Sequence, residues 1–161
     1  FSRMHCEGLD NMCVVGGDAA QVVRNHIKPR SVSHVCINFP EPPHHSGLED
    51  AESRLHLLTD EFFLDVFQVL QDEGVMCVFS DAQKYMQQLA QALGKIKKQK
   101  QATIITLDSD DPHELHGGMR LYEGLPDKEC GHVVNETSYF DRFWEHGKRV
   151  RRFYLAVRVH H

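Results

Sequence analysis

The sequence has no long hydrophobic run. None of its apolar stretches reaches the ~20 residues that a helix needs to cross a bilayer, and no secretory leader pattern is visible at the start of the chain. We therefore expect an intracellular protein, cytoplasmic or nuclear, that does not act at a membrane. The length of 161 residues, with 41% hydrophobic and 25% charged residues, favours a single globular domain with its own core.

The chain also lacks an excess of positive charge. Lys and Arg number 18 against 23 Asp and Glu, which gives a formal net charge of −5 at pH 7. The molecule as a whole therefore does not favour nucleic acid, and any such contact would need a local basic patch. The runs Lys95–Lys100 and Lys148–Arg152 are candidates, although charge runs more often form an ordinary solvated face.

The sequence contains no C-x-x-C pair, no G-x-S-x-G elbow and no phosphate-binding P-loop. It has five cysteines, an odd number. Of these, Cys13, Cys36 and Cys77 lie in apolar, strand-like runs. They are typical of buried thiols in a reducing compartment. The remaining metal-ligand types do not have the spacing of a zinc motif, so we predict no metal site; they are His44, His45, His113, His116, Cys130 and His132.

Strand-like and helix-like segments alternate along the chain. This order predicts parallel βαβ units and an α/β sheet. We expect strands over residues 12–17, 34–39, 75–80, 102–107 and 151–159. We expect helices over 19–27, over 59–74 with Thr59 as N-cap and Gly74 as stop, and over 82–93 with Gly94 at the end.

One part of the single domain, residues 95–132, does not follow this alternation in full. It begins with the basic connector Lys95–Lys100 and continues into the strand at 102–107. Residues 108–132 are rich in Asp, Gly, His and Pro, so we predict a long surface loop. This polar insert is a candidate surface for a partner.

Three carboxylates follow three of the predicted strands. Asp18 follows the first, Glu41 the second and Asp81 the third. In parallel sheets ligands bind outside the carboxyl ends of the strands, so the three side chains are candidates for one site. Asp18 and Asp81 each precede a helix, and N-capping alone is an equally good explanation for them.

Glu41 stands between Pro40 and Pro42 and does not open a helix directly. Each proline biases the residue before it toward extended geometry, so we expect Phe39 and Glu41 both to be extended. A carboxylate on so stiff a segment loses little entropy when it engages a ligand. The alternative is a rigid surface turn with a solvated glutamate.

Four segments, taken in order, resemble the tRNA (guanine-N7-)-methyltransferases. They are "EGLDNMCVVGGDA", "VCINFPEP", "FFLDVFQVLQDEGVMCVFSDAQKYMQQL" and "ETSYFDRFWEHGKRV". The family pattern consists of G-D-A, F-P-D-P, a strand that ends in T-D, and a late T-x-x-E. The corresponding segments of this sequence are G-D-A, F-P-E-P, S-D and S-Y-F-D. The resemblance implies a Rossmann-like class I methyltransferase sheet with helices on both faces. It also implies S-adenosylmethionine as cofactor and transfer of its methyl group to N7 of guanine in tRNA.

The resemblance assigns roles to individual residues. Glu41 and Asp81 would be catalytic, beside the methyl donor and the target guanine. Binding of the cofactor would fall to Asp18, Ala19, Asn38, Phe39, Ser138 and Asp141. Binding of the substrate would fall to Arg54, Asp81, Thr137 and Ser138. The family also implies tRNA as a partner, with either a WD-repeat subunit or a second copy of the chain.

The sequence departs from the family pattern in three ways. It contains no E-x-G-x-G cofactor loop, which implies an N-terminally incomplete domain that lacks the first two strands. We therefore expect the chain as it stands to be inactive and to bind S-adenosylmethionine poorly. Glu41 replaces an aspartate, which moves the carboxylate by about 1.5 Å, and a shift of ~1 Å can cost about a hundredfold in rate. The segment after it is acidic where the family is basic, with Arg54 as its only fixed positive charge. A catalytically degenerate domain that acts as a binding or partner subunit is therefore the alternative.

Overall fold

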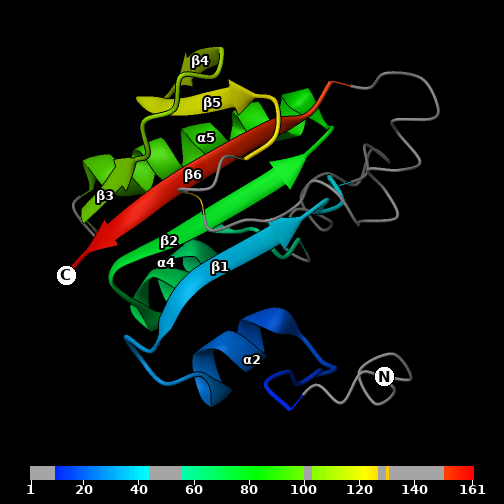
Figure 1. Ribbon diagram of the computed structural model, residues 1–161, viewed down its shortest axis with the longest axis vertical. Coiled ribbons are helices and arrows are strands. Elements are labelled where there is room, and N and C mark those ends of the chain that lie inside the picture. The colour runs from blue at the N-terminus through cyan, green and yellow to red at the C-terminus, as the bar shows by residue number, and fades with distance from the viewer. Residues whose placement is uncertain (1–9, 44–55, 100–102, 127–129, 131–150) are drawn as a thin grey trace.

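A computed structural model describes residues 10–43, 56–99, 103–126, 130 and 151–161. Figure 1 shows a twisted sheet with helices α4 and α5 packed on one face and α2 beside the strand at its edge. The helices are α2 (Ala19–His26), α4 (Asp60–Val69) and α5 (Gln83–Lys98). The strands are β1 (Val32–Asn38), β2 (Leu70–Ser80), β3 (Thr103–Thr106), β4 (His113–His116), β5 (Met119–Glu123) and β6 (Phe153–His160).

The sheet is mixed, with strand order β1-β2-β6-β5-β4 and β3 paired with β6. Strands β1 and β2 are parallel and joined through α4, so the predicted βαβ unit is confirmed there. Strand β6 runs antiparallel to β2, β3 and β5, and β4 runs antiparallel to β5. The expected α/β fold is therefore correct, whereas parallel pairing among the described strands is confined to β1 and β2.

Helix α4 forms where its capping signal predicts it. The Thr59 hydroxyl accepts a hydrogen bond from the Phe62 amide at 3.2 Å, and acidic residues load the first turn. The helix ends at Val69 and passes directly into β2, so the predicted stop at Gly74 is wrong. Gly74 is needed for another reason: a Cβ there would lie 2.8 Å from the carbonyl oxygen of Gln71.

Helix α5 does not end at Gly94, as the sequence suggested. It continues to Lys98, so most of the predicted basic connector is the last turn of this helix. Gly94 is buried, and a Cβ there would lie 2.2 Å from the carbonyl oxygen of Gly117 in the β4–β5 turn. The glycine allows the helix backbone to approach the hairpin, and it does not terminate the helix.

We expect Gly94→Ala to destabilise the protein by about 1–3 kcal/mol, the usual cost of overpacking. Alanine is the better helix former by about 1 kcal/mol, but the clash is with backbone that cannot rotate away. Urea unfolding measures the difference. Gly16→Ala is the matched control, because a Cβ at Gly16 meets nothing within 4 Å. A Gly94→Ala protein as stable as the parent would contradict this packing.

The predicted strand at residues 12–17 is wrong. These residues adopt no regular secondary structure, and Met12, Val14 and Val15 are all more than half exposed. Helix α2 follows as expected, and it packs beside α4, where Arg24 makes an ion pair of 2.6 Å with Asp65. The apolar run at 12–15 therefore finds no partner strand among the residues that the structure describes.

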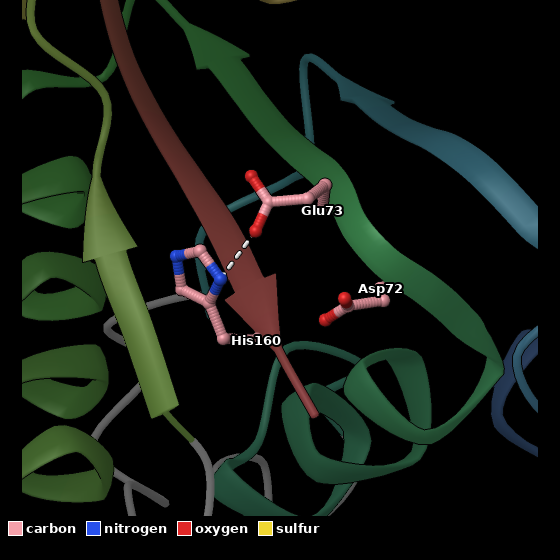
Figure 2. Close-up of side chains that lie close together, drawn as sticks. All are labelled: Asp72, Glu73 and His160. Atoms are coloured by element: carbon pink, nitrogen blue, oxygen red, sulfur yellow. Dashed lines mark ion pairs between the residues drawn. The ribbon is translucent and has the colours of Figure 1, made fainter.

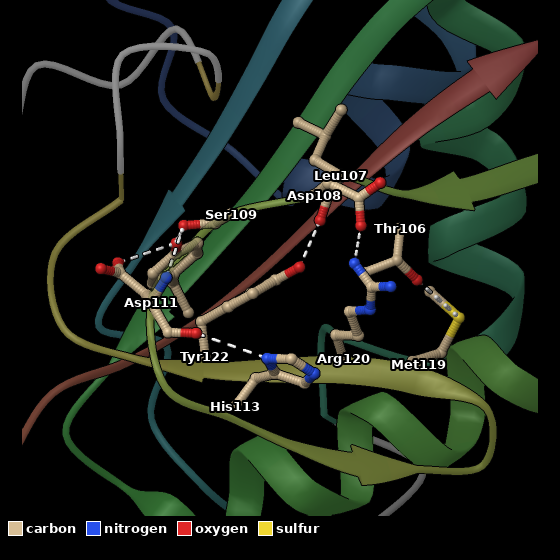
Figure 3. A network of polar contacts seen from close by, with 10 residues as sticks. Thr106, Leu107, Asp108, Ser109, Asp111, His113, Met119, Arg120 and Tyr122 are labelled. Atoms are coloured by element: carbon tan, nitrogen blue, oxygen red, sulfur yellow. Dashed lines mark hydrogen bonds and ion pairs between the residues drawn. The ribbon is translucent and has the colours of Figure 1, made fainter.

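Residues 108–126 are not one long loop. They contain the β4–β5 hairpin, which is joined to the rest of the sheet by the network in Figure 3. The rings of Tyr122 and Tyr154 stack with centroids 4.9 Å apart, and the Tyr122 hydroxyl donates to the carbonyl of Leu107. The Tyr154 hydroxyl lies 3.0 Å from both Ser109 Oγ and Asp111 Oδ2, and burial raises the pKa of Tyr154.

Strand β1 lies at one edge of the described sheet, and its side chains are exposed or half-buried. Cys36 is exposed, whereas its register partner Cys77 on β2 is buried. The prediction of buried thiols is confirmed for Cys77 and is wrong for Cys13 and Cys36; Cys130 is buried as well. None of the described helices is long and apolar enough to cross a membrane.

Candidate active site

The carboxyl ends of β1 and β2 lie side by side, because the two strands are parallel and Asn38 pairs with Phe79. The chain leaves β1 through the proline-bracketed Glu41 and leaves β2 directly into α5. Between these two exits lies a pocket of about 640 Å³. Its lining comprises Glu41, Pro42, Pro43, Ala82, Gln83, Lys84, Tyr85 and Gln88. The carboxylate that the sequence singled out thus borders a concave site at a strand end, the usual location of a ligand.

The turn that leads to Glu41 differs from the expectation. Phe39 was predicted to be extended, but its φ is +47°, in the left-handed region. Its amide donates to the carbonyl of Phe79 at 2.7 Å, and its ring packs edge-on against the Phe79 ring at 5.1 Å. These contacts offset a conformation that costs about 1–3 kcal/mol in a residue other than glycine. Strain of this kind at a strand end often accompanies a functional site.

A short chain of contacts fixes the backbone of Glu41 to helix α5. The Nε2 atom of His56 lies 2.9 Å from the carbonyl oxygen of Glu41 and 2.6 Å from the hydroxyl of Tyr85. Tyr85 is 5% exposed, and burial raises the pKa of its phenol well above the ordinary value. Tyr85 lies in the helix predicted over residues 82–93, but no local pattern in the sequence indicated its contact with His56.

Asp81 follows the end of β2 and is half-buried, but it is not among the described residues that line the pocket. The capping position of α5 is Ala82, which has no side chain to cap with, so the capping explanation does not hold for the Asp81 carboxylate. The backbone carbonyl of Asp81 accepts from the Gln83 amide at 3.1 Å instead. Asp81 therefore neighbours the pocket, and its predicted role in catalysis stays a prediction.

Asp18 caps helix α2, because its Oδ1 accepts from the Gln21 amide at 2.9 Å. Ala19 is the exposed first residue of that helix, and Asn38 is the exposed last residue of β1. Figure 1 places the N-terminal end of α2 on the same side as the carboxyl end of β1. The cofactor roles of Asp18, Ala19, Asn38 and Phe39 stay predictions, and neither Asp18 nor Asn38 is among the described residues that line the pocket. Four further predicted site residues lie outside the described part of the chain: Arg54, Thr137, Ser138 and Asp141.

A second polar cluster lies where β2 begins and β6 ends, at the opposite end of these strands from the pocket (Figure 2). Asp72, Glu73 and His160 place their ligand-type atoms within 4.8 Å of one another. These groups already have partners: Glu73 pairs with His160 and, at 3.6 Å, with Arg158. The backbone amide of His161 donates to Asp72 and lowers the pKa of that carboxyl. The cluster ties the start of β2 to the end of β6.

The sequence matches a known protein family over most of its length. Residues 1–124 match the family model described as "Putative methyltransferase". The chain is 29% identical over 114 residues to a tRNA (guanine-N(7)-)-methyltransferase of Chlamydia caviae, an alignment that covers 70% of this chain and 45% of the relative. It is 30% identical over 89 residues to the enzyme of that name from Chlamydia abortus, over 55% of this chain and 38% of the relative.

A tRNA (guanine-N(7)-)-methyltransferase of Buchnera aphidicola is 24% identical over 81 residues, half of this chain and 32% of the relative. The matched part of the chain thus spans less than half the length of each of these relatives. The family model covers well over half of this chain and includes both strand exits that border the pocket. The chain therefore belongs to this methyltransferase family.

Proposed function

We propose that the gene product containing this chain transfers a methyl group from S-adenosylmethionine to N7 of guanine in tRNA. The observation that carries the proposal is the position of Glu41, on a proline-bracketed strand exit and at the edge of the pocket beside α5. Membership of a methyltransferase family and the names of the bacterial relatives support it. tRNA is the partner within this proposal, and a WD-repeat subunit or a second copy of the chain stays a prediction.

The pocket has the size and the groups to hold a purine. Its volume of about 640 Å³ lies within the range of small-molecule sites. The rings of Pro42 and Pro43, which line the pocket, offer apolar surface to a base. The Glu41 carboxylate can accept hydrogen bonds from N1–H and the amino group of guanine, an edge that adenine does not present. This arrangement favours guanine over the other bases.

The chemistry asks little of the protein beyond alignment. N7 of guanine carries a free lone pair in the neutral base, so no proton leaves before the attack on the methyl carbon. Holding the nucleophile, the carbon and the sulfur in line is itself worth a large part of the barrier. This reaction needs a carboxylate that orients the base, and it needs no strong general base.

The described residues fit one part of S-adenosylmethionine. When bound, the cofactor supplies an electrophilic methyl group on a cationic sulfonium, and a negative charge near that sulfonium would favour it. Asp18 stands on the same side of the molecule, with one oxygen used to cap α2. The glycine-rich loop that would hold the rest of the cofactor does not occur in this sequence.

The proposal is tested with the complete gene product, unmodified tRNA and S-adenosylmethionine labelled on its methyl group. We expect label in tRNA and, after reduction, chain cleavage by aniline at the methylated guanine. A matched tRNA that carries deazaguanosine, in which C–H replaces N7, should accept no label. If the gene product shows no cofactor binding by calorimetry and no methyl transfer, the proposal is contradicted. That result would favour the degenerate binding domain.

A further inference from the structure

We propose that His56 is a positioning residue that holds Glu41 at the edge of the pocket through a single fixed tautomer of its imidazole. The inference rests on the proposed function in one respect, since the consequence is read as methyl transfer. The link itself is independent of the reaction. It joins the carbonyl oxygen of Glu41 to helix α5 by way of His56 and Tyr85.

Two backbone groups with fixed roles determine the tautomer. The Leu58 amide can only donate, and it donates to Nδ1 of His56 at 3.2 Å, so Nδ1 carries no proton. The Glu41 carbonyl can only accept, and it lies 2.9 Å from Nε2, so Nε2 carries the proton. The imidazole is therefore neutral with Nε2–H, and this proton points at the backbone of the candidate catalytic residue.

Tyr85 completes the arrangement from the side of α5. Its hydroxyl oxygen lies 2.6 Å from Nε2 and 3.4 Å from Nδ1 of His56, so the side chain contacts the imidazole directly. The two rings pack edge to face, with centroids 5.1 Å apart and planes at 88°. Because Tyr85 is 5% exposed in the first turn of α5, the imidazole is held by the helix and by the backbone at Leu58.

The hydrogen bond from His56 determines where the proline-bracketed segment at Glu41 lies. Prolines at 40 and 42 restrict the backbone torsions around Glu41, but they do not determine how the segment lies against α5. The hydrogen bond from His56 supplies that placement, because it joins the carbonyl of Glu41 itself to the helix that forms the other wall of the pocket. Loss of this bond leaves a rigid carboxylate in the wrong place.

Two substitutions separate positioning from packing. His56→Gln keeps a donor near the location of Nε2 and can still reach Glu41. His56→Asn keeps an acceptor near the location of Nδ1 for the Leu58 amide but cannot reach Glu41. We expect single-turnover methyl transfer by the complete gene product to fall about 10- to 100-fold in His56→Asn, because a misplacement of ~1 Å can cost a hundredfold. His56→Gln should recover most of the rate.

The midpoint of thermal unfolding and the affinity for S-adenosylmethionine should be the same in the two variants. Equal rates in the two variants, or a rate that follows the unfolding midpoint, would overturn the proposal. Nitrogen NMR of the imidazole in the wild-type protein provides a readout that needs no activity. The Nε2–H tautomer is expected, and the Nδ1–H tautomer would overturn the link. If the wild-type protein transfers no methyl group yet shows the expected tautomer, the proposed function fails and the link between His56 and Glu41 stands.

Discussion

Glu41→Gln is expected to lower methyl transfer to tRNA guanine about 100-fold or more, the size of effect seen when one stabilising group is lost from a preorganised site. The amide replaces one acceptor oxygen with a donor that faces the donors of the guanine edge. The measurement is a single-turnover rate with saturating cofactor, so that binding and chemistry are separated.

Two matched variants serve as controls for this result. Glu41→Asp keeps the charge and both acceptor oxygens and shortens the side chain to the length found in the family pattern, so its rate should exceed that of Glu41→Gln. Glu61→Gln removes another exposed carboxylate, on α4 and outside the pocket lining, and should leave the rate unchanged. A Glu41→Gln rate within about threefold of the wild-type value, a barrier change under ~1 kcal/mol, would contradict a catalytic role for this residue.

Phe63→Ala is expected to lower the free energy of unfolding by about 3–5 kcal/mol. Phe63 is fully buried in the core cluster that joins α4 and α5 to the sheet. Its removal leaves a cavity beneath the pair of strands that carries the pocket, so the loss of stability should be accompanied by a loss of activity near the unfolding midpoint. Urea unfolding provides the measurement.

Gln68→Ala is the control on the same helix, because Gln68 is exposed and alanine is the better helix former. Its free energy of unfolding should change by no more than about 0.5 kcal/mol, as for most surface substitutions. A Phe63→Ala protein that loses less than the Gln68→Ala protein would mean that α4 is not packed on the sheet as described.

Local signals predicted the elements whose causes are local. The apolar face and the capping threonine of α4 predicted that helix, and the apolar run at 151–159 predicted β6. Gly94 illustrates the limit of such signals. Its sequence context is that of a helix stop, but the backbone of Gly117 in the hairpin decides its role, and that contact joins residues distant in sequence.

The same limit applies at the site. The prolines on either side of Glu41 and its place after a strand predicted a carboxylate at a sheet edge, and the pocket lies there. The left-handed turn at Phe39 opposes the bias that a following proline imposes, and it is held by contacts with Phe79 across the sheet. His56 and Tyr85 meet only because the chain returns to the pocket, so sequence alone gave no sign of their link.

The proposed function requires that the methyl-accepting guanine occupy the pocket between the exits of β1 and β2. Photo-crosslinking of the complete gene product to tRNA with thioguanosine at the acceptor position, followed by peptide mapping, tests this directly. We predict cross-links to the segments that line the pocket, at residues 41–43, 82–85 and 88. Cross-links found only elsewhere, for example on the last turn of α5 at Lys95–Lys98 or on the β4–β5 hairpin, would contradict this placement of the guanine.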